Sequence, residues 1–458
     1  MKYTLQLTCL VLIAFAAQLK AQQKNTLTLK EAFAEADRTY PGLAERAATV
    51  GEYQIRKKEV QSRAIPQVQL QAQNSYGTFQ GSSGAFFPVP GVFNVTGNNT
   101  PIGSGVQATG NTFGSVVMDW KVFEFGKQRK AIDAAEYQAQ GAQSSYDAAQ
   151  LSLHSKVSRL YLDIYYSHAN LNWAEKNVKR VNQILDLSVS LSLAGLKPGA
   201  DTALASSAYS QALAVRHEWL GKYEASKINF QEVVPLRDWS PQEQVPAMGD
   251  SMAIATDSVK KDHPYLQVID KQLQYEKAME QVASRKIFPS LSVLGGVSTR
   301  GSGIGKNGIA ENGLGSGYQN FADNYLVGIG LTWNISGAYT SSLEKKRSKK
   351  TIQGVQAKYN LQRLQMSTSL QALSSRITQQ QQLLKESDKA FKKASDAYEL
   401  YLSRYESGLI NLTELLQIQS LLEAAERENI QAGQNYWNLI TAQAEISGDF
   451  SYLLNHFN

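Results

Sequence analysis

The stretch Tyr325-Leu-Val-Gly-Ile-Gly-Leu-Thr-Trp-Asn334 alternates between large apolar residues and small or polar ones. Successive side chains of a β-strand point to opposite faces, so this stretch predicts a strand with one apolar and one wet face. About ten such residues with aromatic ends are typical of a strand that crosses a membrane and faces lipid. An ordinary antiparallel sheet on a soluble core would give the same pattern, and this alternative stays open.

Three shorter segments alternate in the same way, at residues 67–73, 118–122 and 290–293. Membrane barrels need about eight strands or more, and the sequence shows no others. We therefore expect several subunits to pool their strands. The side chains expected to face lipid are Trp120, Tyr325, Ile329, Leu331 and Trp333.

Landmarks around these strands recur in the same order, which identifies a tandem repeat. The paired landmarks are Pro41 and Pro264, Pro66 and Pro289, Trp120 and Trp333, and Gly195 and Gly408. The first two pairs lie 223 residues apart (264−41 and 289−66), and the last two lie 213 apart (333−120 and 408−195). The copies therefore differ by ten residues, in loops rich in Gly, Asn, Ser and Thr at about Thr78 to Asn111 and Gly301 to Asp323.

The N-terminal segment predicts export. Lys2 precedes an apolar run, and Leu19-Lys-Ala21 resembles a cleavage site, so residues 1–21 are expected to be a signal peptide removed after Ala21. The only cysteine, Cys9, lies inside it; a lipid-anchored Cys9 is the alternative, although nothing around it resembles a lipobox. We expect a first repeat at 22–233, a linker at 234–261 and a second repeat at 262–458, co-folded as one domain.

Composition argues against several classes of protein. Removal of the signal takes two lysines and no acid, so the net charge falls from +6 to +4, and no basic cluster with interleaved aromatics suggests nucleic acid. The five histidines are scattered, and no Ser/His/acid grouping has readable spacing, so we expect no enzyme, cofactor or metal site. Gly303-Ile-Gly-Lys-Asn-Gly308 matches a dinucleotide fingerprint only by accident, because no helix follows it.

Most of the remaining sequence predicts helices. Segments from about Lys127 to Leu193 and from about Tyr339 to Ser407 lack proline and would be about 100 Å long. Apolar steps of three and four between Phe391 and Tyr405 predict a coiled-coil seam. Further helices are expected at about Leu29–Arg63, Asp201–Val233, Pro264–Arg285 and Leu412–Leu454. A secreted trimeric coiled-coil spacer or adhesin would explain the helices but not the strands.

The duplicated order of these features resembles the TolC family of outer-membrane efflux ducts over essentially all of the mature sequence. The residues that carry the resemblance are the paired prolines, the strand-to-helix passages Phe123–Lys127 and Asn334–Gly337, and the tips Gly195–Asp201 and Tyr405–Leu409. The resemblance implies a mainly α fold with a small transmembrane β part. Three chains would form a homotrimer, with a twelve-stranded β-barrel in outer-membrane lipid continued by a twelve-helix tube across the periplasm of a Gram-negative-type bacterium.

The resemblance also implies roles for the tips. Gly195, Leu196, Gly408 and Leu409 would contact a periplasmic adaptor of an inner-membrane pump, although both Gly-Leu pairs also suit ordinary helix C-caps. Asp201 and Glu414 each follow a tip glycine by six residues, so threefold symmetry would gather six carboxylates in one ring. Their alternative role is as first-turn acids favoured by the helix dipole.

The family holds its aperture shut with a tyrosine, an arginine and facing aspartates near the second tip. Tyr405 matches the tyrosine, whereas Ile410 and Gln417 stand where the arginine and a second aspartate are expected. Any ionic latch is therefore partial. The resemblance implies passive export of small molecules from an adaptor–pump complex, and the alternative is the exit duct of a type I protein secretion system.

Overall fold

The computed structural model describes residues 27–79, 107–235, 259–306 and 309–457. The expected signal peptide, most of the first expected loop and most of the expected linker lie outside these residues. Contacts divide the chain into two compact units, and both units take segments from both repeats. Unit 1 draws on residues 1–48, 143–268 and 359–458, and unit 2 draws on residues 49–142 and 269–358.

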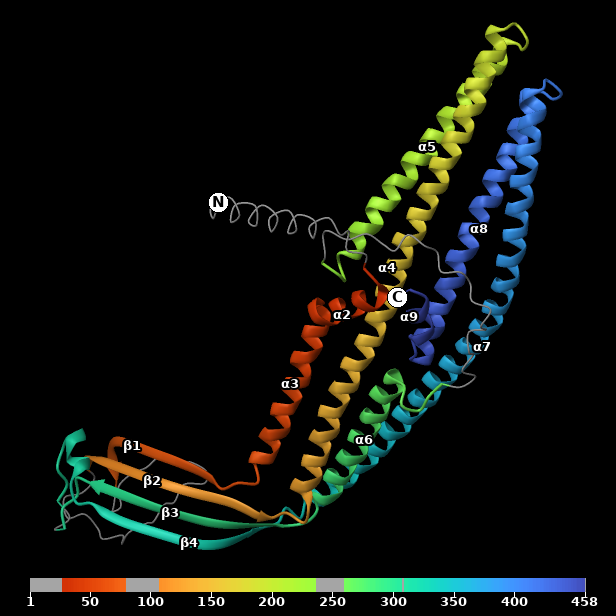
Figure 1. Ribbon diagram of the computed structural model, residues 1–458. Helices are drawn as coiled ribbons and strands as arrows, with labels where there is room; N and C mark the ends of the chain where they lie inside the picture. Colours follow the sequence, from red (N-terminus) through yellow and green to blue (C-terminus); the bar gives the residue numbers. More distant parts are fainter. Residues whose placement is uncertain (1–26, 80–106, 236–258, 307–308, 458) are drawn as a thin grey trace, which may run out of the picture. The chain divides into compact units, whose positions relative to one another are not determined.

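The order of a helix, a strand pair, a long helix and a returning helix occurs twice along the chain (Figure 1). In the first copy these elements are α2 (Leu29–Thr39), α3 (Pro41–Ser62), β1 (Gln67–Phe79), β2 (Gln107–Phe123), α4 (Lys127–Leu193) and α5 (Gly199–Phe230). In the second copy they are α6 (Pro264–Arg285), β3 (Ser290–Ser302), the 3-10 helix η1 (Leu314–Tyr318), β4 (Ala322–Thr332), α7 (Gly337–Glu406), α8 (Leu412–Ser447) and α9 (Ser451–His456). The expected mainly α fold with a small β part is confirmed.

Two of the expected helices are each divided in two. The prediction of one helix from Leu29 to Arg63 was wrong at Tyr40, which is extended with φ −71° and ψ 118°. A residue before proline is disfavoured in the helical region, so Pro41 begins a new helix. The prediction of one helix from Leu412 to Leu454 was wrong at Gly448, whose left-handed φ of 73° ends α8.

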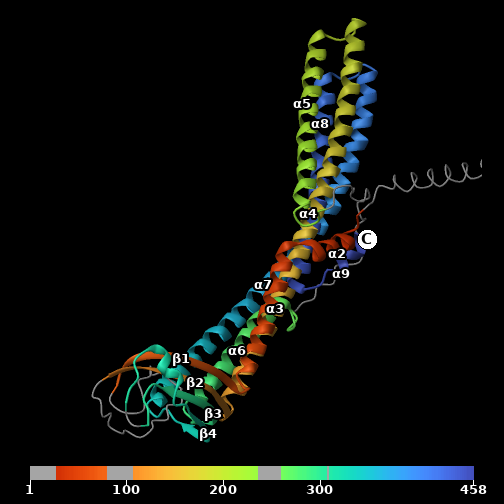
Figure 2. The ribbon, with the colours of Figure 1, turned by 90° about the vertical axis from the view of Figure 1, so that its left-hand side faces the viewer.

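The long helices form where the sequence predicts them. Lys127–Leu193 has the expected bounds, and α7 begins two residues before the expected Tyr339. Figure 2 shows α4 beside α5 and α7 beside α8. The seam residues Ala394, Tyr398 and Tyr405 are buried in one cluster, here called the tip core, with Ile184 of α4, Ala205 of α5 and Leu415 of α8. All four helices therefore share one apolar core close to their tips.

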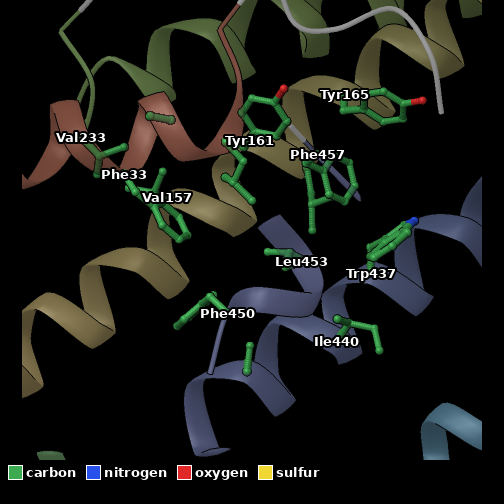
Figure 3. Packing of buried hydrophobic residues seen from close by; sticks show 14 of the residues in the cluster. Phe33, Val157, Tyr161, Tyr165, Val233, Trp437, Ile440, Phe450, Leu453 and Phe457 are labelled. Carbon is green, nitrogen blue, oxygen red and sulfur yellow. The ribbon is translucent and has the colours of Figure 1, made fainter. Parts of the chain in front are cut away.

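A second core in unit 1, the central core, joins the first and last described helices. Phe33 of α2 packs edge-on against Phe450, with ring centroids 5.5 Å apart. Phe457 lies 4.9 Å from the Trp437 ring and 6.0 Å from the Tyr161 ring (Figure 3). Such edge-to-face pairs add about 0.5–1.5 kcal/mol each beyond simple burial. The N–H of Leu29 also donates to the Phe457 carbonyl at 3.1 Å, so both repeats build this core.

The four strands of unit 2 form one antiparallel sheet in the order β1-β2-β3-β4. They are longer than the sequence predicts: β2 begins at Gln107, inside the expected loop that ends at Asn111. The pairing register places Leu70 opposite Val116, Val116 opposite Val297, and Val297 opposite Tyr325. Directly paired residues share a face, so the apolar positions of all four strands make one continuous surface, here called the apolar sheet face.

Within the described ranges, none of the helices is both long and apolar enough to span a bilayer. In the same part of the chain, no three His, Asp or Glu side chains gather in an arrangement that could hold a metal ion.

Candidate functional site: the helical tips and the apolar sheet face

The two tips have the same backbone conformation. Gly195 and Gly408 have φ of 72° and 74°, in the left-handed region that favours glycine. In the first tip, the N–H of Gly195 donates to the Ser192 carbonyl and the N–H of Leu196 donates to the Leu191 carbonyl, each at 2.9 Å. The second tip repeats both bonds at the same lengths. These are Schellman-type bonds, so the C-cap role considered from the sequence is present at both tips.

The tip leucines point to solvent. Leu196 is 69% exposed and Leu409 is 74% exposed, and no heavy atom outside the local chain lies within 4 Å of a side chain added at either tip glycine. The tips therefore offer open backbone and an apolar side chain on each hairpin. Their contact with an adaptor stays a prediction.

The two tip carboxylates occupy different surroundings. Asp201 is half-buried in the first turn of α5, where Pro198 precedes the helix and supplies no side-chain cap. Glu414 is exposed and belongs to the N-cap of α8: Asn411 Oδ1 accepts from the Glu414 N–H at 2.9 Å, and Asn411 Nδ2 donates to the Glu414 carboxylate at 2.8 Å. Glu414 thus has the local helix-start role that the sequence left open, and its place in a carboxylate ring stays a prediction.

Tyr405 lies inside the tip core rather than at a surface. Its side chain is fully buried, and burial raises the pKa of the hydroxyl above its ordinary value. The Ser188 hydroxyl of α4 opposes that shift and the Asp201 carboxylate adds to it, so both groups lie near the Tyr405 hydroxyl. Neither hydroxyl makes a hydrogen bond of good geometry with the described residues. The Tyr405 hydroxyl is therefore enclosed within the tip core of its own chain.

Sequence reasoning assigned no role to Lys197, which joins the two tips. Its Nζ donates to the Ile410 carbonyl at 3.1 Å and lies 5.5 Å from the centroid of the Tyr405 ring. Ile410 is the position where the family resemblance led us to expect an arginine, and Gln417 is exposed. A cation is thus present beside Ile410 of the second tip, but it is Lys197 of the first tip. The sequence feature that could have indicated this contact is the lysine between Leu196 and Pro198.

The apolar sheet face contains the residues expected to contact lipid. Tyr325, Ile329 and Leu331 of β4 are 83%, 74% and 67% exposed. Trp120 and Trp333 are exposed as well, and each indole N–H donates to a backbone carbonyl, that of Ala64 at 2.9 Å and that of Ile287 at 3.0 Å. These two bonds are equivalent in the two repeats, since 287−64 gives the same offset of 223 as the proline pairs.

Comparison with known proteins agrees with this arrangement. In Rhizobium leguminosarum bv. trifolii, Nodulation protein T is 21% identical over 360 residues, which cover 76% of this chain and 74% of that protein. Among solved structures, the outer-membrane channel OprN has a TM-score of 0.73 at 17% identity, covering 92% of this chain and 89% of that one. The outer membrane channel CmeC of Campylobacter jejuni has the same TM-score at 14% identity, covering 92% and 85%. These likenesses establish a shared fold.

The MtrE outer membrane channel of Neisseria gonorrhoeae, solved in an open state, has a TM-score of 0.69 at 16% identity and covers 92% of this chain and 89% of that one. The model of the family described as outer membrane efflux protein matches residues 34–229 and 256–444, most of both repeats. The chain belongs to the outer membrane efflux protein family.

Proposed function

We propose that three copies of this chain form an outer-membrane exit duct that passively releases small molecules delivered by a periplasmic adaptor and an inner-membrane pump. The observation that carries this proposal is the apolar sheet face. Its side chains are exposed along all four strands, and β1 and β4 each have one strand neighbour among the described residues. An exposed apolar face with two open edges suits a barrel completed by neighbouring chains in lipid.

The helical tips would form the periplasmic aperture. Threefold symmetry would bring Asp201 and Glu414 of each chain into one acidic ring, which favours cations over anions. Lys197 supplies one cation per chain beside Ile410 and Tyr405, in place of the arginine that the family resemblance led us to expect at position 410. Opening requires the tip core of Tyr405 to loosen, so adaptor contact at Leu196 and Leu409 would act directly on the aperture.

The test combines mass measurement of the detergent-solubilised protein with recordings in planar bilayers. We expect three chains per particle and a conducting channel that prefers cations. The double variant Asp201→Lys with Glu414→Lys should lower this preference. A matched control, Glu218→Lys with Glu224→Lys, reverses two exposed charges further along α5 and should leave it unchanged.

The outcomes separate two parts of the proposal. Unchanged ion selectivity in the tip variant would show that these carboxylates do not form the aperture. A monomeric particle without conductance would rule out the duct itself.

A further inference from the structure

A hollow of about 510 Å³ lies where β2 passes into α4, within unit 2. One side is apolar, formed by Phe123 and Phe125. The other side is charged, formed by Arg129, Lys130, Asp133 and Arg285. Such a division between an apolar wall and a cationic wall suits a ligand with one apolar part and one anionic part.

The apolar wall continues the apolar sheet face. A register shift between Lys121 and Phe123 places Phe123 opposite Leu291, on the same face as Trp120 and Val293. The Phe123 and Phe125 rings lie 4.7 Å apart, and Phe125 stacks on Phe288 at 5.2 Å. All three rings are exposed, at 52%, 38% and 46%. They form an aromatic cluster at the point where the strands give way to helices.

The charged wall has excess positive charge. Lys130 pairs with Asp133 at 2.9 Å, which leaves the guanidinium groups of Arg129 and Arg285 without a carboxylate among the described residues. Arg129 is exposed, whereas Arg285 is half-buried and donates through Nη1 to the Phe125 carbonyl. Guanidinium groups suit phosphate because they offer several donors in a planar fork.

The backbone of the passage is adapted to hold Arg285. Phe125 and Gly126 both have left-handed φ, of 51° and 80°, and this conformation is costly for phenylalanine. It aims the Phe125 carbonyl at Arg285, and a side chain on Gly126 would meet the Arg285 guanidinium at 3.1 Å. In the equivalent passage of the second repeat, the Asn334 side chain instead accepts from the Gly337 N–H at 2.9 Å. The two strand-to-helix passages are therefore built differently, and the hollow combines residues of both repeats, because Arg285 comes from α6.

We propose that this hollow binds the phosphate headgroup of an anionic membrane phospholipid, with an acyl chain lying along Phe123, Phe125 and the apolar sheet face. The assignment rests on the proposed function, which puts the ends of the strands at the membrane surface. The hollow lies beside β2 and β3, the two central strands of the sheet. Neighbouring chains that join at the edges of β1 and β4 would leave it open to lipid.

The experiment is native mass spectrometry of the full-length trimer from nanodiscs that contain phosphatidylethanolamine and phosphatidylglycerol. The wild type should retain phosphatidylglycerol preferentially, at up to three copies per trimer. In Arg129→Gln with Arg285→Gln, we expect phosphatidylglycerol retention to fall about tenfold or more, since each basic group near a membrane surface contributes appreciably to anionic lipid binding. Lys349→Gln with Lys350→Gln is the matched control, because it removes the same charge from exposed positions further along α7 and should retain wild-type binding.

Arg285 also holds the Phe125 carbonyl, so Arg129→Gln alone provides a variant without that structural contact; it should lose part of the phosphatidylglycerol preference. Equal loss in the α7 control would show that net charge, not the hollow, selects the lipid and would overturn the assignment. Displacement of the lipid by excess inorganic phosphate would identify a free-anion site and would also overturn it. Conductance of the wild type and of each variant is recorded in parallel. A conducting wild-type trimer without lipid preference refutes this inference alone, whereas a wild type that forms no conducting trimer refutes the duct.

Discussion

His263, at the start of α6, has both ring nitrogens engaged. Nδ1 accepts from the Tyr265 N–H at 3.2 Å, so the side chain caps the helix, and Nε2 donates to the Glu445 carbonyl at 3.1 Å. This pattern requires the neutral ring, because protonation at Nδ1 would remove its acceptor. Burial lowers the pKa of His263, partly opposed by Glu445 and Asp262.

The free energy of unfolding should therefore depend on pH through His263. Because the pKa of His263 is lowered in the folded state, the unfolded state binds more protons near pH 6. The contribution of neutral His263 to the free energy of unfolding is therefore fully present above about pH 6.5 and is lost as the pH falls. The slope from one group is at most about 1.4 kcal/mol per pH unit. His263→Asn keeps a capping acceptor that does not titrate. Thermal unfolding from pH 7.5 to 5.5 should show a smaller loss for this variant, and equal losses would contradict the assignment.

Asn411 provides a second test at the scale of one residue. Its side chain caps α8 through the Glu414 N–H, so Asn411→Ala should destabilise the protein by about 1 kcal/mol. Thr413→Ala changes an exposed neighbour in the same turn and should have little effect. Both are measured by thermal unfolding in detergent. An unchanged Asn411→Ala midpoint would mean that the cap is replaced by another contact in the assembled protein.

At the scale of elements, the tip turns depend on backbone conformation alone. Nothing lies within 4 Å of a side chain added at Gly195 or Gly408, so Ala at either position should cost about 1 kcal/mol through its left-handed φ and not through a clash. Asn tolerates this conformation better, so Gly195→Asn should be milder than Gly195→Ala. Thermal unfolding of the variants measures the difference. A larger cost for Asn would indicate that another chain occupies the space at the tip.

The sequence predicted the long elements well because their signals are periodic and cooperative. The bounds of α4 follow from an unbroken helical pattern, and the alternation around Ile329 predicts β4 and its exposed face. Tyr40 and Gly448 were missed because a single residue outside the helical region interrupts an otherwise amphipathic pattern. Lys197 was missed for a different reason: its partners, Ile410 and Tyr405, lie more than 200 residues away, and no local pattern encodes such a contact.

At the scale of the whole molecule, the apolar sheet face should determine whether the protein enters a membrane. Ile329→Arg places a charge on this face, at the position of β4 opposite Val293, and should destabilise insertion by about 2–4 kcal/mol. Asn324→Arg is the matched control, because its position lies on the opposite face of the same strand. Flotation with lipid vesicles measures insertion, and equal recovery of both variants would argue that the apolar sheet face does not contact lipid.

The hydrogen bond between Leu29 and Phe457 has a consequence for how the chain folds. These residues are separated by nearly the full length of the described chain, yet they lie in the same apolar core as Phe33 and Trp437. Contacts of such high sequence separation slow folding, because a long loop must close before burial compensates for its entropy. The N-terminal helix can contact α4 early, where Phe33 stacks on His154, but it lacks the contacts of Phe450 and Phe457 until the C-terminal segment has been synthesised. Until then, apolar side chains of this core stay exposed, and such exposure favours aggregation of the emerging chain.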